Sequence, residues 1–274
     1  MKKEDFLKFD ENLKTKNKLI HQIWFGLFPN KKQAEIDYEK MKKYRDTWTT
    51  NNKDWNRIEW NKQMCELLIK EFFPEHYSTF KKYKYEIQRC DFVRYAILYR
   101  YGGFYVDMDY ICNCNIDNIL KKYNNEIYFV QTPNTVFFQN EDHISNSLMY
   151  SRNRNNIFWK VLMIQLEKYC KTPSYYSKHL AVMYSTGPGI LNRLYLKYKY
   201  MYKLKSFPYI NFQPYGIKDN IRSINLPSHI YMAHMNRGSW EESDSKFFIT
   251  FVREWKILVF ILLVIIFFVL LSRL

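Results

Sequence analysis

Glycine, alanine and cysteine are scarce in this chain: its 274 residues include 7 glycines, 4 alanines and 5 cysteines. An odd number of cysteines does not form a complete disulfide framework, and none of them has zinc-site spacing. Cys112 and Cys114 are separated by one residue, and no His-x-x-x-His pair follows them. We therefore expect free thiols in a reducing compartment and no zinc knuckle.

Two signals of secretion are also missing. None of the 23 asparagines begins an Asn-x-Ser/Thr glycosylation sequence. The first 14 residues, MKKEDFLKFDENLK, contain no hydrophobic stretch of the kind that a signal peptide has. Both absences favour a domain that never enters the secretory lumen.

Acidic residues are few as well, since 27 Asp and Glu stand against 42 Lys and Arg, for a formal net charge of +15. Lys, Asn, Tyr, Ile and Phe are abundant, which is typical of an AT-rich genome and is the simplest explanation of the excess. Attraction to anionic lipid and binding of nucleic acid are the functional alternatives. The basic residues are scattered and no nucleic-acid-binding motif occurs, so nucleic acid ranks last.

One long hydrophobic run is present. Residues 257–271, ILVFILLVIIFFVLL, are 15 apolar residues without a charge. As a helix they span about 22 Å, which is short of the ~30 Å core of an average bilayer. Trp255, Lys256 and Ser272 can extend the span, and a thin membrane reduces the mismatch. A buried core helix is the alternative, but a run that is apolar on all sides favours a single-pass anchor over residues 257–272.

The most informative segment runs from Arg89 to Asp109, RCDFVRYAILYRYGGFYVDMD. Its first part predicts an amphipathic helix that carries Asp91 and Arg94, and a Gly-Gly break separates this helix from a short apolar strand. The strand ends on Asp107 and Asp109. Two carboxylates at the carboxyl end of a strand can project into the crevice where open α/β sheets bind ligands. Hard oxygen ligands in that place suit Mn²⁺ or Mg²⁺ carrying a diphosphate.

An Asp-x-Asp pair alone is weak evidence, because 12 aspartates in 274 residues produce roughly half such a pair per chain by chance. A solvated loop pair is therefore the alternative for Asp107 and Asp109. Asp91 and Arg94, one helical turn apart, could likewise form an ordinary i, i+3 ion pair. The glycine break and the apolar strand before the carboxylates favour metal binding.

Strands and helices alternate along the rest of the chain, which indicates an α/β sheet flanked by helices in one domain. We expect strands at residues 19–25, 55–60, 104–106, 126–131 and 135–139. We expect helices at residues 32–48, 63–72, 86–100, 157–170 and 190–201.

The central segment resembles the signature of sugar transferases with the GT-A fold, in particular glycosyltransferase family 32 and, more remotely, the large clostridial glucosylating toxins. Two further stretches are similar to the first two strands of that family, IHQIWFG at 20–26 and TWTTNNKDWNRIEW at 47–60. Thr186-Gly187-Pro188 and AHMNRGSW at 233–240 resemble weaker family elements. The family pattern stands here as Asp91, Arg94, Leu98-Tyr99, Gly102-Gly103, Tyr105, Asp107 and Asp109.

The resemblance implies a GT-A fold with a mixed central sheet over residues 18–245. An N-terminal tail (1–17) would precede this domain, and a linker (246–256) and the transmembrane helix (257–272) would follow it. Because no signal peptide is present, we expect the anchor to be inserted after synthesis, which leaves the catalytic domain in the cytosol.

The implied activity is that of a hexosyltransferase, similar to mannosyltransferases and to enzymes of capsular polysaccharide synthesis. It would move a hexose from a UDP- or GDP-sugar to a lipid, glycan or protein acceptor at a membrane, with retention of configuration. Mn²⁺ or Mg²⁺ would bridge the donor phosphates. Asp109 would be the direct metal ligand and Asp107 would hold ribose or metal through water, and both count as catalytic residues. His234 would complete the metal shell.

The donor contacts implied by the resemblance are Ile23, Trp24, Asp91, Arg94, Gly103, Tyr105 and Trp240. Trp24 would stack on the nucleotide base, and Asp91 and Arg94 would hold hydroxyl or phosphate groups. Ordinary alternatives are a core position for Trp24 and a loop histidine at 234. His21, inside the first apolar strand, is better explained as a buried structural histidine.

Two other classes of function remain open. One is a catalytically inactive membrane scaffold with the same fold, and the intact Asp-x-Asp together with Asp91 and Arg94 argues against it. The other is a basic nucleic-acid-binding protein, whose binding would depend steeply on salt. Neither alternative explains the Gly-Gly-x-Tyr-x-Asp-x-Asp frame.

Overall fold

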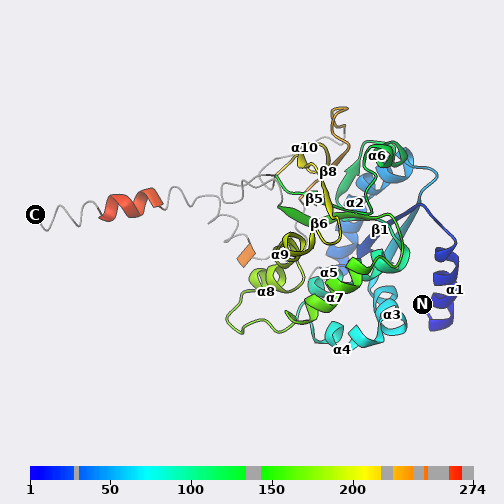
Figure 1. The fold of residues 1–274 in the computed structure, drawn as a ribbon, viewed down its shortest axis with the longest axis horizontal. Coiled ribbons are helices and arrows are strands. Elements are labelled where there is room, and N and C mark those ends of the chain that lie inside the picture. The colour runs from blue at the N-terminus through cyan, green and yellow to red at the C-terminus, as the bar shows by residue number, and fades with distance from the viewer. Residues whose placement is uncertain (28–30, 134–142, 217–224, 237–243, 246–258, 267–274) are drawn as a thin grey trace, which may run out of the picture.

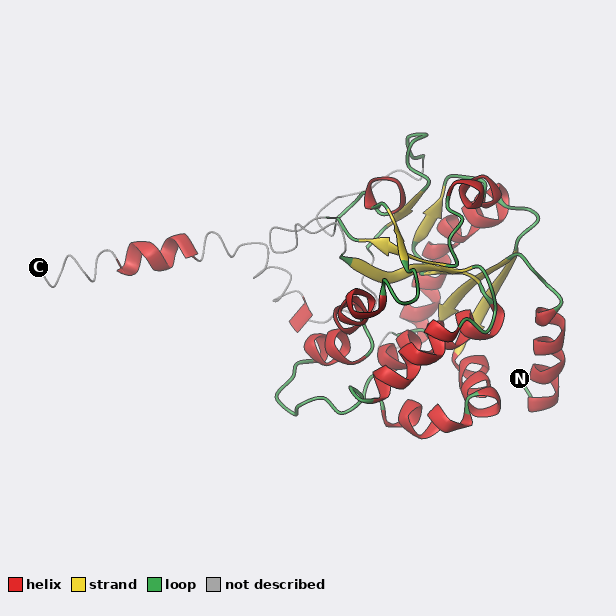
Figure 2. Cartoon of the chain, viewed as in Figure 1, coloured by secondary structure: helices red, strands yellow, loops and turns green. Residues whose placement is uncertain are grey.

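The computed structural model describes residues 1–27, 31–133, 143–216, 225–236, 244–245 and 259–266. They form an α/β fold in which helices cover both faces of a central sheet (Figures 1 and 2). The main sheet has six strands in the order β2-β1-β3-β6-β5-β7. These strands are β1 (Leu19–Trp24), β2 (Asn56–Asn61), β3 (Gly103–Val106), β5 (Ile127–Gln131), β6 (Ile144–Ser151) and β7 (Lys205–Phe207).

The sheet is mixed, as expected. Strand β1 pairs in parallel with β2 and β3, whereas β6 is antiparallel to β3 and β5. Because β1, β2 and β3 run in the same direction, their carboxyl ends meet at one edge of the sheet, here called the carboxyl edge. Two more strands, β4 (Tyr110–Cys112) and β8 (Met232–His234), form a separate antiparallel pair.

Helices on each face cover a separate hydrophobic cluster. One face carries α5 and α7 with their neighbours, and the other carries α2, α6 and α10 (Figure 1). The helices are α1 (Lys3–Lys14), α2 (Lys31–Asn51), α3 (Lys62–Phe72), α4 (Pro74–Lys82), α5 (Glu86–Tyr101), α6 (Ile116–Lys122), α7 (Ile157–Glu167), α8 (Lys178–Ser185), α9 (Pro188–Tyr198) and α10 (Tyr209–Phe212).

Alternation along the strands supplies both clusters. Successive side chains of a strand point to opposite faces, so Phe104 and Val106 of β3 pack on the α2 side while Tyr105 packs on the α5 side. On β5, Tyr128 faces the α2 side and Phe129 the α5 side. The sheet is therefore buried on both faces.

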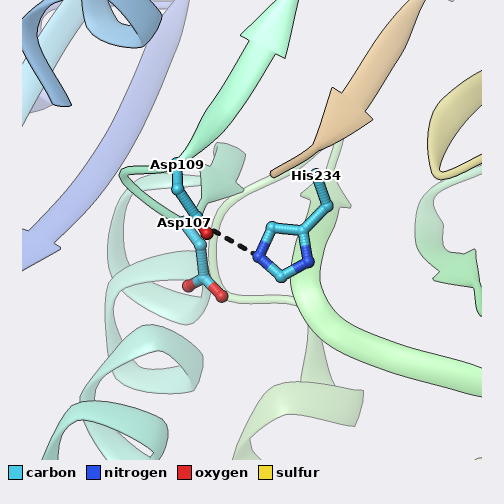
Figure 3. Close-up of side chains that lie close together, drawn as sticks. All are labelled: Asp107, Asp109 and His234. Atoms are coloured by element: carbon cyan, nitrogen blue, oxygen red, sulfur yellow. Dashed lines mark ion pairs between the residues drawn. The ribbon is translucent and has the colours of Figure 1, made fainter. Parts of the chain in front are cut away.

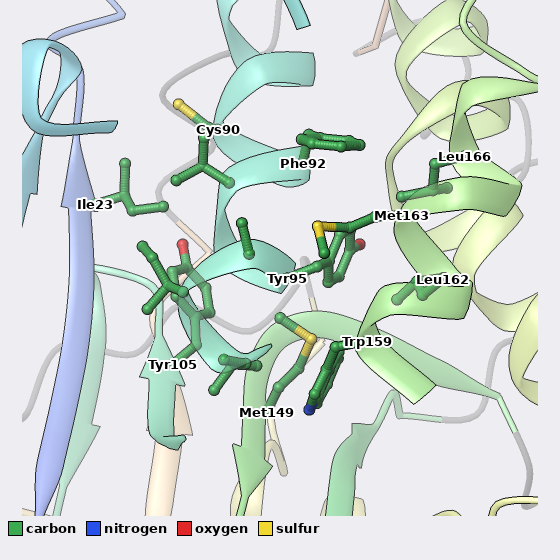
Figure 4. Packing of buried hydrophobic residues seen from close by; sticks show 14 of the residues in the cluster. Ile23, Cys90, Phe92, Tyr95, Tyr105, Met149, Trp159, Leu162, Met163 and Leu166 are labelled. Atoms are coloured by element: carbon green, nitrogen blue, oxygen red, sulfur yellow. The ribbon is translucent and has the colours of Figure 1, made fainter. Parts of the chain in front are cut away.

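Helix α5 is buried on nearly all sides, which differs from the amphipathic helix expected. Every residue from Ile87 to Leu98 except Arg89 is buried. The helix lies between the sheet and α7, whose Trp159 and Met163 pack near it (Figure 4). Charged side chains on such a helix enter the interior, where charges are stable only with partners.

Most predicted elements are present with boundaries within a few residues. Pro74 begins a separate helix, α4, because proline suits the first helical turn. Strands β4, β6, β7 and β8 were not expected, and the strand expected at 135–139 lies outside the described residues.

The N-terminal segment differs from the tail that we expected. It forms α1, whose Phe6 and Leu13 are buried in the core on the α5 side. Asp10, on the same helix, accepts hydrogen bonds from Arg100 and Tyr101 at the end of α5. The helical spacing of these positions was already present in the sequence.

No helix among the described residues is long and apolar enough to cross a membrane. Of the anchor expected at 257–272, residues 259–266 are described. They are helical, and all but Val264 are exposed. The rest of that segment lies outside the described part of the chain, so the transmembrane helix stays a prediction.

Candidate active site

The two carboxylates of the Asp-x-Asp pair lie in the turn between β3 and β4, at the carboxyl edge. The backbone N–H of Asp107 donates to the carbonyl oxygen of Ser147 on β6 at 2.9 Å, and that of Tyr110 donates to the carbonyl of Asp107 at 3.2 Å. The turn is thus tied to the sheet. The side chains of Asp107 and Asp109 are 27% and 11% exposed, so both carboxylates are only partly shielded from solvent.

Gly103 begins β3 where this strand passes very close to β1. Its φ is +82°, and an added Cβ would clash with the carbonyl oxygen of Leu19, so only glycine fits. On β1, His21 donates from Nε2 to the Gly102 carbonyl at 3.0 Å while Trp60 donates to its Nδ1 at 3.2 Å. The expected structural role of His21 is confirmed, and burial lowers the pKa of this neutral imidazole to about 3.

Asp107, Asp109 and His234 come together from distant parts of the chain (Figure 3). Each offers one ligand atom, and these atoms lie within 4.8 Å of one another. Nε2 of His234 is 3.0 Å from Oδ1 of Asp109. His234 reaches this place because β8 pairs with β4, opposite Tyr110, and the two rings stack with centroids 4.8 Å apart. The structure therefore groups the three predicted metal ligands, while the ion that they bind stays a prediction.

The electrostatics of this cluster suit a cation. Burial lowers the pKa of His234, but the carboxylates of Asp109 and Asp107 outweigh burial, and the net shift is upward. Burial raises the pKa of Asp107, although Arg94 and His234 oppose this effect. The cluster therefore offers two carboxylates and an imidazole, a donor set that divalent transition metals bind.

Asp91 and Arg94 of α5 form the i, i+3 ion pair, at 3.0 Å, that was the ordinary alternative to donor contact. Arg94 also reaches the Asp-x-Asp turn. Its guanidinium is 3.4 Å from Asp107 and lies over the ring of Tyr105, 4.7 Å from the centroid. The hydroxyl of Tyr105 donates to Asp107 at 2.7 Å. Burial raises the pKa of Asp91 to about 6, against the influence of Arg94. The pair is thus physically part of the same site.

Two residues beside Asp91 were not among the predicted site residues. Nδ2 of Asn146 donates to Asp91 at 3.0 Å, and the Asn146 carbonyl accepts from Arg94 at 2.8 Å. Oγ1 of Thr186 donates to Asp91 at 3.1 Å. Thr186 starts one of the segments with a family resemblance, so it could have been proposed. For Asn146 the signal is its place in the run Ser145–Ser147, because three polar residues inside a buried strand are unusual.

Other predicted donor contacts lie near the end of β1. Ile23 is buried in the core, whereas Trp24 is partly exposed and packs against Tyr38 with ring centroids 5.6 Å apart. The segment after Trp24 borders a cavity of about 400 Å³. This donor-edge cavity is lined by Phe25, Gly26, Leu27, Lys62, Lys84, Tyr85, Glu86, Ile87 and Lys178. Trp240 lies outside the described residues.

Comparison with known proteins matches residues 38–126 to the family described as "Glycosyltransferase sugar-binding region containing DXD motif". This range contains Asp91, Arg94, Asp107 and Asp109. The resemblance to DXD-type sugar transferases inferred from the sequence is therefore confirmed.

Curated relatives of the chain are named as mannosyltransferases or related synthases. The chain is 31% identical over 182 residues to mannosyl phosphorylinositol ceramide synthase CSH1 of Saccharomyces cerevisiae. The aligned region covers 66% of this chain and 43% of that protein. It is 28% identical over 233 residues to inositol phosphoceramide mannosyltransferase 2 of Schizosaccharomyces pombe, covering 83% and 59%. The chain thus spans about half the length of the curated relatives it matches.

Among solved structures, "PaToxG Glycosyltransferase" aligns with a TM-score of 0.45 and 15% identity, over 71% of this chain and 78% of that one. A likeness at this level does not by itself establish a common fold.

Proposed function

We propose that this chain, whose residues 38–126 carry the sugar-binding region of DXD-containing glycosyltransferases, has a GT-A fold and transfers a hexose from a nucleotide sugar to an acceptor hydroxyl. The observation that carries the proposal is the convergence of Asp107, Asp109 and His234 beside the Asp91–Arg94 pair. The convergence lies at the carboxyl edge, where open α/β sheets bind their ligands.

Asp107, Asp109 and His234 would hold a divalent cation, with Asp109 as the direct ligand and Asp107 acting directly or through water. Held by these residues, such a cation would neutralise charge on the leaving diphosphate. The imidazole favours Mn²⁺ over Mg²⁺, because Mg²⁺ prefers oxygen ligands.

The chain's own residues would position the donor. The guanidinium of Arg94 is fixed by Asp91, Asp107 and the Asn146 carbonyl before any ligand arrives, so little ordering is needed on binding. Asp91, whose pKa burial raises to about 6, would accept a hydrogen bond from a sugar hydroxyl. The nucleotide would lie in the donor-edge cavity, with its base against Trp24.

The finer chemistry follows the relatives and the family resemblance. The names of the relatives describe mannose transfer to inositol phosphoceramide, which supports mannose as the hexose and a lipid head group as the acceptor of this chain. The donor would be GDP- or UDP-linked. Retention of configuration would follow from front-face attack, with the leaving phosphate as the base.

The test is a panel of nucleotide sugars scored for donor hydrolysis and for transfer to lipid acceptors, with and without Mn²⁺. We expect one preferred donor, loss of turnover in EDTA and its recovery on addition of Mn²⁺. Undiminished turnover in excess EDTA would reject the metal-dependent mechanism. Nucleotide binding without turnover of any donor would favour the inactive scaffold instead.

We also propose that residues 257–272 anchor the chain in a membrane, with the catalytic domain on the cytosolic side. The 15-residue apolar run, the free cysteines and the absence of glycosylation sequences support this arrangement. Protease added to intact vesicles should digest the catalytic domain. Full protection of residues 1–255 would contradict the proposed orientation.

A further inference from the structure

A group of surface tyrosines lies on α8 and on the segment that joins α7 to α8. Tyr175 is 83% exposed and Tyr184 is 53% exposed. The ring of Tyr176 contacts both, with centroid distances of 5.3 Å to Tyr175 and 6.2 Å to Tyr184. Lys171 and Lys178 stand at either end of this segment of the chain. These five residues are called the tyrosine surface.

The tyrosine surface adjoins the proposed active site. Lys178 lines the donor-edge cavity, and its Nζ is 5.9 Å from the ring centroid of Tyr85, the residue that precedes α5. At the other end of α8, Thr186 donates to Asp91. Helix α8 thus connects the tyrosine surface directly to the residues proposed to hold the sugar.

Two described residues that precede the apolar run in the sequence, Asp244 and Ser245, contact α8. The N–H of His179 donates to Asp244 at 2.7 Å, and Nδ1 of His179 is 3.0 Å from Oγ of Ser245. Figure 1 shows residues 244–245, in orange, beside α8. From Ser245 to Ile257 the chain advances 12 residues (257 − 245 = 12), which extend at most about 43 Å. A membrane that holds the apolar run is therefore within reach of the tyrosine surface.

The side chains of the tyrosine surface suit contact with lipid head groups. Tyrosine places an apolar ring and a polar hydroxyl at the membrane–water interface, and lysine is attracted to anionic lipid. We propose that the tyrosine surface rests on the head groups of an anionic membrane and turns the donor-edge cavity toward a lipid acceptor. This inference rests on the membrane attachment and the lipid acceptor proposed above.

The chain offers a matched control. Tyr200 and Met201 are 84% and 71% exposed and lie between Lys199 and Lys203. They precede β7, which is parallel to β5, and β5 runs in the same direction as β3. The control segment therefore lies at the edge opposite the site. Composition alone predicts equal membrane contact for both segments, whereas the proposal predicts contact for one.

The experiment measures contact with lipid in the full chain. Ser174→Cys or Met201→Cys carries an environment-sensitive dye, and Cys114→Ser with Cys170→Ser removes the partly exposed native thiols. The chain is reconstituted in vesicles of equal parts phosphatidylcholine and phosphatidylserine, or of phosphatidylcholine alone. Lipids that bear a nitroxide at the head group then quench any dye at the membrane surface.

We expect strong quenching at 174 and little at 201 in the anionic vesicles. In the Ser174→Cys background, Lys171→Glu should lower the equilibrium constant for this contact at least about fivefold, because it removes the contribution of one lysine and adds a negative charge at an anionic surface. Equal quenching at both positions, or none at 174 in vesicle-bound chain, would overturn the proposal and leave the surface to a protein partner.

Donor hydrolysis separates this inference from the proposed function. Lys171→Glu should hydrolyse the donor at the wild-type rate, because Lys171 lies outside the site. Absence of hydrolysis in the wild-type chain would refute the transferase activity whatever the quenching shows. Hydrolysis in a chain that does not associate with vesicles would refute the membrane contact alone.

Discussion

Two buried carboxylates lie near opposite ends of helix α5: Asp10, which belongs to α1, and Asp91, which belongs to α5 itself. They differ in how fully their negative charge is compensated by hydrogen-bond donors and cations. Asp10 accepts from Arg100 at 2.5 and 2.6 Å and from Tyr101 at 2.5 Å. Burial would raise the pKa of Asp10, but these donors outweigh burial and the pKa is lowered. At the other end, burial raises the pKa of Asp91 to about 6; Arg94 opposes this rise, and the negative charge of Asp107 adds to it. Arg94 contacts both of these carboxylates.

The difference distinguishes a carboxylate that stabilises the fold from the carboxylates of the proposed site. The Asp10 cluster joins α1 to α5 and leaves its carboxylate well partnered. Around Asp91, three carboxylates share Arg94 and His234, so negative charge is in excess. Perturbed groups of this kind gather at functional sites, and a bound cation would restore the balance.

The largest effect should come from Asp109→Asn. The substitution keeps the size of the side chain at a turn and removes a charged metal ligand. Donor turnover should fall at least about 100-fold, since even residues that only support metal ligands contribute 10- to 100-fold. The melting temperature should stay near the wild-type value. A mutant with wild-type turnover would contradict the assigned ligand.

The converse change is Asp10→Asn, at the other end of α5. It breaks a buried ion pair with Arg100, whose side chain is 16% exposed, so we expect a loss of about 2–3 kcal/mol in the free energy of unfolding. Urea titration measures this loss. Turnover per folded molecule should hardly change, and a selective loss of turnover would show that the two clusters are coupled.

A smaller effect is expected for His234→Ala. The variant keeps both carboxylates and loses the imidazole, so the Mn²⁺ concentration for half-maximal turnover should rise at least about tenfold. Nucleotide binding, measured by calorimetry in Mn²⁺, should weaken in parallel. If only the melting temperature changed, His234 would be a structural residue.

The smallest effect concerns pH. The pKa of Asp91 is raised from 3.8 to about 6, so ionised Asp91 costs stability above pH 6, and this cost disappears as pH falls toward 4. Asp10, with a lowered pKa, stabilises the fold above pH 4 and loses that effect in stronger acid. Donor turnover should therefore decline below about pH 6 without a fall in melting temperature. Parallel loss of both would indicate acid unfolding.

Local patterns predicted most of the fold. The Gly-Gly break, the apolar strand and the two aspartates lie within one segment, so their order along the chain already gave the turn at the end of β3. Predictions about helices were wrong where the burial of a helix depends on the elements packed against it. The spacing of apolar residues along α5 could not reveal that α7 packs on its outer side. It also could not reveal that α1 contacts its C-terminal end.

The site was predictable where its residues are close in sequence. Asp91, Arg94, Asp107 and Asp109 follow from one motif, and His234 came only from family resemblance. Asn146 was missed because its contact with Asp91 spans 55 residues of sequence. Such a contact depends on β6 lying beside β3. The order of strands in a sheet cannot be predicted from the local sequence pattern of one strand.

The pairing of β4 with β8 also determines when, during synthesis of the chain, His234 can join the two aspartates. His234 is made 125 residues after Asp109 (234 − 109 = 125), and a ribosome adds about 5–20 residues per second, so the delay is about 6–25 s. During that interval the growing chain has both carboxylates but lacks the imidazole that would complete the centre. The complete cluster can therefore form only after residue 234 has been made and β8 has paired with β4.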